Sequence, residues 1–194
     1  MKKARNIRDI IIKTALELFG KRSYDEVTVN DICSAAHISR TSFYSAFAGK
    51  KDLIVAVMHE RSTFQNIDTT EMLALENDFE RMIHILKFHI GIWDPENIGL
   101  CKTMLTLEIN ENIGIFEYSH AYDPWYEKLI KNCQHSGIIR NMGDPLQLTE
   151  DCIQISKGYV IDWCRTNGSF DLLYAIRAAV ERLGDVAPEY RKCE

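Results

Sequence analysis

Apolar residues recur at steps of three and four positions over most of this chain, a spacing that places them on one face of an α-helix. The clearest example is residues 7–19, where charged residues oppose one apolar stripe and Gly20 follows at a typical helix end. The stripe consists of Ile7, Ile10, Ile11, Thr14, Ala15, Leu18 and Phe19. With 4 Pro and 10 Gly in 194 residues and no strand pattern, the sequence predicts an all-α fold of about nine helices.

Composition and cysteine spacing narrow the class of protein. A hydrophobic fraction of 46% is typical of a folded chain, and no apolar run approaches the roughly 20 residues that span a bilayer. No signal peptide is recognisable, so we expect a cytoplasmic protein. The six cysteines are scattered without a Cys-x-x-Cys pair, so we expect reduced, buried thiols and neither disulfides nor zinc.

Charge is distributed unevenly along the chain. Residues 1–61 hold 11 Lys and Arg against 7 Asp and Glu, whereas the remainder has a net charge of −9, which gives −5 in total. A basic amino-terminal segment is therefore hidden by an acidic average, and such asymmetry is typical of a nucleic-acid-binding part. The alternative is an ordinary solvated surface, and charge alone does not decide between the two.

Two short helices are predicted in succession between residues 28 and 47. Thr28 and Asp31 have the spacing of a capping box at the start of the first helix. Ser39 is a suitable amino-terminal cap for the second helix, expected over 40–47. Two short helices joined by about three residues form a helix-turn-helix, whose second helix can enter a DNA major groove.

The second helix begins with side chains that can read bases. Arg40, Thr41 and Ser42 all carry hydrogen-bonding groups, and Tyr44 and Lys50 lie nearby with groups suited to phosphate oxygens. Any pair of packed helices can be short, so spacing alone leaves a plain helical hairpin open.

The aromatic residues of this helix divide between two roles. Phe43 and Phe47 are four positions apart and are predicted to be core residues. Tyr44 projects to a different side, so the core interpretation does not apply to it.

Residues 24–53 resemble the DNA-binding domain of the TetR family of transcriptional regulators (TetR/AcrR-like). The matching positions are Thr28, Val29, Ile32, Ala35, Ala36, Ile38, Ser39, Phe43, Tyr44, Phe47, Lys50 and Leu53. The family usually has Gly where this chain has His37, which tolerates a left-handed turn conformation at a cost. The resemblance implies phosphate contacts by Thr28, Tyr44 and Lys50, base contacts by Arg40, Thr41 and Ser42, and a place for Ser39 in the same DNA-binding set.

The resemblance also implies a division of labour between two domains. Residues 1–50 would form the helix-turn-helix domain, and residues 51–194 a larger helical domain for ligand binding and dimerisation. In the latter, Asp-Pro pairs and glycines delimit the expected helices. These span residues 72–93, 98–109, 123–137, 145–165 and 170–183.

The last two helices would pair with those of a second copy in a four-helix bundle. Ser156 and Gly158 would allow close approach of the two copies, and larger side chains would supply the buried area. The candidate dimerisation residues are Ser156, Tyr159, Val160, Trp163, Ile176 and Val180. Because periodicity does not say which core a stripe faces, Tyr159 and Trp163 have an equal alternative in the core of the protomer.

The same region is rich in aromatic residues of the kind that line ligand pockets. The candidate ligand-binding residues are Phe79, His84, Phe88, Trp93, Phe116, Tyr122, Trp125 and Tyr126. Ordinary cores use the same material, so each of these residues also has a core interpretation. No cluster has metal-ligand spacing, and neither a metal nor another cofactor is expected.

The sequence therefore favours a homodimeric repressor that binds operator DNA and is released from it by a small molecule, without a membrane partner. A ligand-binding helical enzyme is the first alternative, although no nucleophile–base pair or phosphate-binding glycine loop is present. An activator or adaptor of the same fold is the second alternative.

Overall fold

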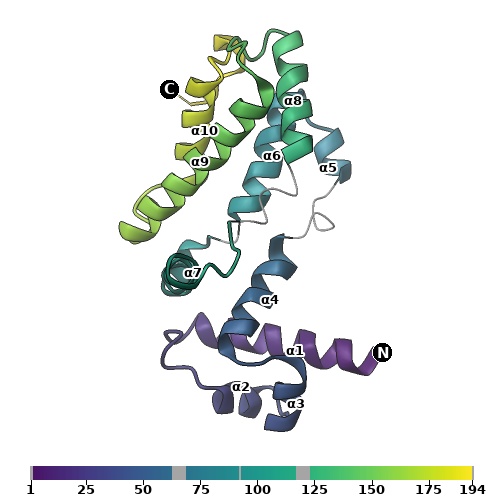
Figure 1. Ribbon diagram of the computed structural model, residues 1–194, viewed down its shortest axis with the longest axis vertical. Coiled ribbons are helices and arrows are strands. Elements are labelled where there is room, and N and C mark those ends of the chain that lie inside the picture. Colours follow the sequence, from purple (N-terminus) through teal and green to yellow (C-terminus); the bar gives the residue numbers. More distant parts are fainter. Residues whose placement is uncertain (1, 63–68, 92, 117–122, 194) are drawn as a thin grey trace. The chain divides into compact units, whose positions relative to one another are not determined.

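The computed structural model describes residues 2–62, 69–91, 93–116 and 123–193, and it confirms the all-α fold in these ranges (Figure 1). One isolated antiparallel bridge, between Ile139 and Val186, accompanies the helices. The residues group into two compact units: unit 1 is 1–61 with 94–115, and unit 2 is 62–93 with 116–194. No helix in the described ranges has the length and hydropathy needed to cross a bilayer.

Unit 1 contains the amino-terminal helices and one later helix. Its elements are α1 (Lys2–Phe19), α2 (Val29–Ala35), α3 (Arg40–Ala46), α4 (Lys50–Ser62), η2 (Pro95–Asn97) and α7 (Ile98–Glu111). α1, α2 and α3 pack against one another. Their core includes Ile11, Ile32, Phe43 and Phe47, each at most 1% exposed. The predicted stripe of α1 is slightly rotated, because Ile10 is 40% exposed and Ile12 is buried instead.

The beginnings of α2 and α3 follow the capping pattern of the sequence. The Thr28 hydroxyl accepts from the Asp31 amide at 3.1 Å, and the Asp31 carboxylate accepts from the Thr28 amide at 2.7 Å, which completes the predicted capping box. The Ser39 hydroxyl accepts from the Ser42 amide at 3.0 Å at the start of α3. Side chains therefore satisfy amides that a helix start leaves without a partner.

Three helices, α2, α9 (Pro145–Arg165) and α10 (Leu172–Leu183), end in the same left-handed turn. The residue that follows the carboxyl-terminal cap has a positive φ in each turn, although it is not glycine. These residues are His37 (φ 52°), Asn167 (φ 57°) and Asp185 (φ 44°). In each turn the amide of the following residue donates to the carbonyl five residues before it, with nitrogen–oxygen distances of 3.0, 2.8 and 2.9 Å. This is the Schellman motif, and His, Asn and Asp tolerate its left-handed position better than most residues.

Unit 2 is built on helices that pack side by side (Figure 1). Its elements are α5 (Thr69–Leu73), α6 (Asp78–Ile90), α8 (Asp123–His135), α9 (Pro145–Arg165), α10 (Leu172–Leu183) and η4 (Pro188–Tyr190). α8 packs against α6 and α9, and α10 packs against α9 and α6. Phe79, Ile85, Ile130 and Ile176 are each at most 1% exposed in its core.

Two predicted helices of this region have different bounds in the structure. The stripe over 72–93 is divided between α5 and α6, because the Asn77 side chain accepts from the Glu80 amide at 2.9 Å and starts a new helix. α10 starts at Leu172 rather than residue 170, because Asp171 provides its cap, accepting from the Tyr174 amide at 2.9 Å. Periodicity continues across such breaks, so it conceals them.

A cluster of charged side chains ties α6, α10 and the carboxyl-terminal segment together. Arg177 donates to Glu80 at 2.6 and 3.1 Å and to Glu181 at 2.8 Å, and Lys192 lies 3.2 Å from Glu80. Glu181 also accepts from the amides of Lys192 and Cys193. Burial opposes the charged form of Glu80, but the hydrogen bond and charge of Arg177 outweigh it and lower the pKa of Glu80.

Replacing Arg177 with methionine is expected to lower the free energy of unfolding by roughly 3 kcal/mol, because two buried carboxylates lose their main partner. Arg165→Met is the control, since Arg165 pairs with Asp162 but its side chain is 72% exposed, and it should cost less than about 0.5 kcal/mol. Denaturant unfolding of both variants measures the difference. Equal unfolding midpoints would show that the buried cluster adds no stability.

Candidate functional site

The recognition face of α3 lies opposite its buried face. Phe43 and Phe47 are 0% and 1% exposed, as their spacing predicts, whereas Tyr44 is 48% exposed. Arg40 and Thr41 are also exposed at the amino-terminal end of the helix. The structure therefore brings a guanidinium, a hydroxyl and a phenol together on the solvent side of one short helix.

Arg40 and Tyr44 are one turn apart on this face and contact each other. The Arg40 guanidinium carbon lies 5.8 Å from the centroid of the Tyr44 ring, within the range of a cation–π interaction. This contact restricts the guanidinium on the free protein without using its N–H donors. Arg40 thus keeps the fork of donors that suits guanine O6 and N7 or a phosphate.

Two other predicted DNA contacts, Ser39 and Ser42, serve the helix itself. Besides accepting from the Ser42 amide, the Ser39 hydroxyl oxygen lies 2.9 Å from the Ser42 hydroxyl oxygen. The structure places both at the base of the recognition face but gives them a capping role there. Each hydroxyl keeps some hydrogen-bonding capacity for another partner.

Thr28 and Lys50 stand at the starts of α2 and α4, each with a partner inside unit 1. The Thr28 hydroxyl donates to Asp31 at 2.7 Å. Lys50 donates to the Tyr24 carbonyl at 2.6 Å, and its ammonium nitrogen lies 4.1 Å from the Tyr24 ring centroid. Partial burial lowers the pKa of Lys50. An ammonium group has three donors, so a phosphate contact would use those that remain.

Arg8 in α1 also positions α3, although no local sequence pattern singles it out. It donates to the Ala46 carbonyl at 3.1 Å, and its guanidinium lies 4.4 Å from the Phe47 ring centroid. Carbonyls at a helix end have no partner within the helix, so this bond satisfies one of them. The contact joins residues 38 positions apart, a separation that helical periodicity does not report.

The structure places most of the candidate dimerisation residues inside the protomer. Val160, Trp163, Ile176 and Val180 are at most 3% exposed, and the Trp163 indole donates to the Phe170 carbonyl at 3.0 Å. Ser156 and Tyr159 are half-buried on α9. The four buried side chains therefore face the core of this chain, the alternative that periodicity left open for Trp163.

The candidate ligand-binding residues are distributed over several environments. Phe79 is fully buried, His84 and Phe88 are half-buried, and Trp125 is 43% exposed. Tyr122 lies outside the described residues.

Other members of this candidate set contact one another or a partner that the sequence did not indicate. Trp93 stacks on Phe116 at 6.3 Å between centroids, and the Lys157 ammonium lies 5.7 Å from the Phe116 ring. The Tyr126 hydroxyl oxygen lies 3.3 Å from Nδ1 of His89, whose ring is tilted against the Tyr126 ring. We call these five residues, which form two separate contact groups, the aromatic cluster.

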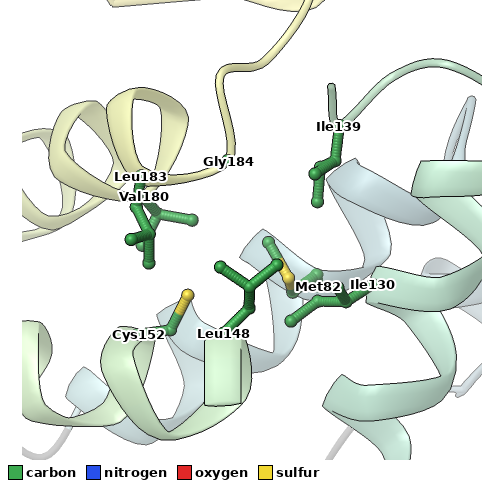
Figure 2. Close-up of a pocket in the computed structure, with 8 residues that line it drawn as sticks. All are labelled: Met82, Ile130, Ile139, Leu148, Cys152, Val180, Leu183 and Gly184. Carbon is green, nitrogen blue, oxygen red and sulfur yellow. The ribbon is translucent and has the colours of Figure 1, made fainter. Parts of the chain in front are cut away.

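An apolar pocket of unit 2 lies elsewhere (Figure 2). Its enclosed volume is about 10 Å³, roughly enough for one water molecule. It is lined by Met82, Ile130, Ile139, Leu148, Cys152, Val180, Leu183 and Gly184, and none of these is a candidate ligand-binding residue. Sites that enclose a drug-sized ligand usually measure about 300–1,000 Å³, so this pocket is smaller than such a site.

The cysteines and the other possible metal ligands of the described ranges determine whether reactive thiols or a metal site are present there. Cys33, Cys101, Cys133 and Cys164 are buried, whereas Cys152 and Cys193 are half-buried, and all are unbridged. Burial raises the pKa of Cys133 and Cys152 to about 12, so these thiols are protonated and unreactive at neutral pH. No group of three or more His, Cys, Asp or Glu in these ranges could hold a metal ion.

His89 should make the stability of the protein sensitive to acid. Burial lowers its pKa from 6.5 to about 4, so the unfolded chain takes up a proton first as the pH falls through that window. Stability is therefore complete above about pH 6.5 and is lost towards pH 4, by roughly 3 kcal/mol at most.

Denaturant unfolding at several pH values tests this, with His89→Gln expected to flatten the dependence. His84→Gln, in the same helix, is the matched control. An unchanged slope in His89→Gln would show that other groups cause the acid sensitivity.

Comparison with known proteins agrees with this architecture. The sequence profile of the bacterial regulatory proteins of the tetR family matches residues 11–57, which cover the helix-turn-helix. A probable acrEF/envCD operon repressor of Escherichia coli K12 is 24% identical over 93% of this chain and 86% of its own length. An uncharacterised HTH-type regulator of Pseudomonas putida, TtgW, is 30% identical over 41% of this chain and 60% of its own length.

Solved structures share the whole fold. A TetR-family transcriptional regulator from Pectobacterium atrosepticum has a TM-score of 0.74 at 17% identity, with 98% of this chain and 99% of that one covered. A regulatory protein TetR from Rhodobacter sphaeroides has a TM-score of 0.63 at 19% identity, with 90% and 97% covered. The profile match over residues 11–57, the curated relatives and the exposed face of α3 together support a TetR/AcrR-like transcriptional regulator with an amino-terminal helix-turn-helix for DNA binding.

Proposed function

We propose that the protein is a homodimeric repressor that leaves its operator when a small molecule binds. The observation that carries this proposal is the exposed amino-terminal end of α3, where Arg40 and Thr41 face solvent while Phe43 and Phe47 anchor the helix. The repressor named among the relatives supports the direction of regulation. Binding to chromosomal DNA would place its action in the cytoplasm.

Each DNA contact would have a distinct effect. Arg40 and Thr41, with Ser42 behind them, would read base edges in the major groove. Tyr44, Lys50, Thr28 and Ser39 would contact the sugar–phosphate backbone, which contributes affinity to every sequence and makes binding depend on salt.

The dimer would form on the outer faces of α9 and α10. Ile161 and Tyr174 are 42% and 49% exposed, and Tyr159 lies half-buried beside the core. A Cβ at Gly158 would meet nothing within 4 Å in this protomer, so protomer packing does not require glycine in the middle of this helix. Two copies joined here would hold their recognition helices at a fixed spacing, which is about 34–36 Å for half-sites one turn apart.

The effector would bind beside the aromatic cluster of unit 2. The cluster combines flat apolar surfaces with a neutral imidazole, a phenol and one cation, which suits an effector with an aromatic or other planar apolar part. By linkage, an effector that prefers the DNA-free state must weaken DNA binding by the same factor with which DNA weakens effector binding.

α7 offers a way for the signal to reach the DNA-binding helices. It belongs to unit 1, where Glu111 at its end forms an ion pair with Lys51 of α4. The Glu108 carboxylate accepts from the Ile115 amide at 2.9 Å and fixes the segment that leaves the helix. The chain joins this segment to unit 2 between residues 93 and 94 and between residues 115 and 116. Because Glu111 is paired with Lys51, a displacement of α7 would also move α4.

Selection from random DNA duplexes, followed by affinity measurements, tests the DNA contacts. The protein should enrich one sequence with two related half-sites. Tyr44→Phe should weaken binding to all duplexes alike by about threefold to tenfold, because it removes a phosphate contact. Arg40→Ala should instead reduce discrimination between the selected and a scrambled duplex by tenfold or more, since a bidentate base contact is worth about 1–3 kcal/mol.

The matched control is Arg165→Ala, which removes an exposed arginine of unit 2. Binding of both α3 variants with the affinity of the unaltered protein would contradict the assignment of this face.

Sedimentation at several protein concentrations tests the dimer. Ile161→Lys together with Tyr174→Lys should turn a dimer into a monomer, because four charges would be buried in the interface. Leu73→Lys is the control, since Leu73 is an equally apolar residue that is 68% exposed on α5. A species that stays dimeric in the double variant would place the interface elsewhere.

A further inference from the structure

The turn that precedes the recognition helix demands a backbone conformation for which glycine is best suited. His37 has φ 52°, and its amide and the next one reach back to the carbonyls of Ser34 and Cys33 at 3.3 and 3.0 Å. These two bonds close the end of α2 and fix the direction in which α3 starts. A side chain at this position adds strain that glycine would avoid.

No side-chain contact among the described residues compensates for this strain. His37 is exposed, and no described residue receives a hydrogen bond from its imidazole. Asp185 makes an instructive comparison, because it has the same backbone turn but its carboxylate accepts from Arg140 at 2.8 Å and Arg191 at 3.2 Å. A strained residue whose side chain has no structural task in its own chain is a candidate for a functional one.

The position of His37 indicates what that task is. It lies three residues before Arg40, and a chain of three residues spans at most about 10–11 Å. Successive bases on one strand are about 3.4 Å apart, so a side chain here can reach bases that adjoin those read by Arg40 and Thr41. An imidazole N–H can donate to the acceptor atoms that purines present in the major groove.

We propose that His37 is a specificity-determining residue that donates a hydrogen bond to a purine beside the bases read by Arg40 and Thr41. This inference rests on the proposed function, because it requires that α3 enters the major groove. It assigns a role to the one position of the helix-turn-helix at which this chain departs from the glycine of the resembling domain. In this interpretation, the contact of the His37 side chain with DNA explains why the position holds a strained residue instead of glycine.

His37→Gly separates this role from a structural one, because the two predict different combinations of results. The variant should unfold at a higher temperature than the unaltered protein, since strain is removed. Its affinity for the duplex selected by the unaltered protein should nevertheless fall by about threefold or more, as expected for one lost hydrogen bond, with a smaller loss on a scrambled duplex. Repeating the selection with His37→Gly should remove the preference at one flanking position per half-site.

Two further variants complete the experiment. His37→Asn tolerates the left-handed turn and should shift the preferred base at that position towards adenine, which asparagine recognises. Asn167→Gly makes the glycine exchange in the equivalent turn of unit 2 and should select the same duplex with unchanged affinity.

Equal affinity of His37→Gly and the unaltered protein for the selected duplex would overturn the inference, as would equal losses on selected and scrambled DNA. Failure of the unaltered protein to enrich any sequence would instead contradict the proposed function.

Discussion

Burial of two phenylalanines determines how the recognition helix is presented. α3 has only seven residues, and a helix this short is not stable by itself in water. Phe43 and Phe47, four positions apart, enter the core formed with α1 and α2, and this packing gives the helix both its existence and its orientation. Because the two rings occupy one side, Arg40, Thr41 and Tyr44 must face solvent.

Contacts at both ends of α3 strengthen this arrangement. Ser39 caps its start, and Arg8 donates to a carbonyl at its end while covering the Phe47 ring. Several residues of the implied DNA-binding set therefore have structural work within unit 1, including Thr28, whose hydroxyl completes a capping box. A side chain that holds a helix end in place can still offer its remaining capacity to a phosphate, so the two roles are compatible.

Unit 2 reaches its stability in a different way. Its helices bury an arginine between two glutamates, and this cluster fastens the carboxyl-terminal segment to α6 and α10. The same helices bury Trp163 and Val160, both of which were candidates for a dimer interface. The outer surface of α9 and α10, with Ile161 and Tyr174, is exposed in the protomer.

Much of the fold follows from local chemistry. Apolar spacing, Thr28 with Asp31, Ser39 and the Asp-Pro pairs locate helices because these signals act within a few residues along the chain. The start of a new helix at Asn77 could not be predicted in this way, since the apolar period continues across the break between α5 and α6. The contacts of Arg8 with Ala46 and of His89 with Tyr126 could not be predicted from local patterns either, because each joins distant parts of the chain.

The sequence by itself determined that the chain is helical, where its recognition helix begins and which residues that helix could present to DNA. The tertiary structure alone decided which apolar stripes face the protomer core, which polar side chains are occupied at helix ends and where the charged cluster forms. The physical reason is that hydrogen bonds within a helix and caps are local, whereas burial depends on which surfaces meet after the chain has folded.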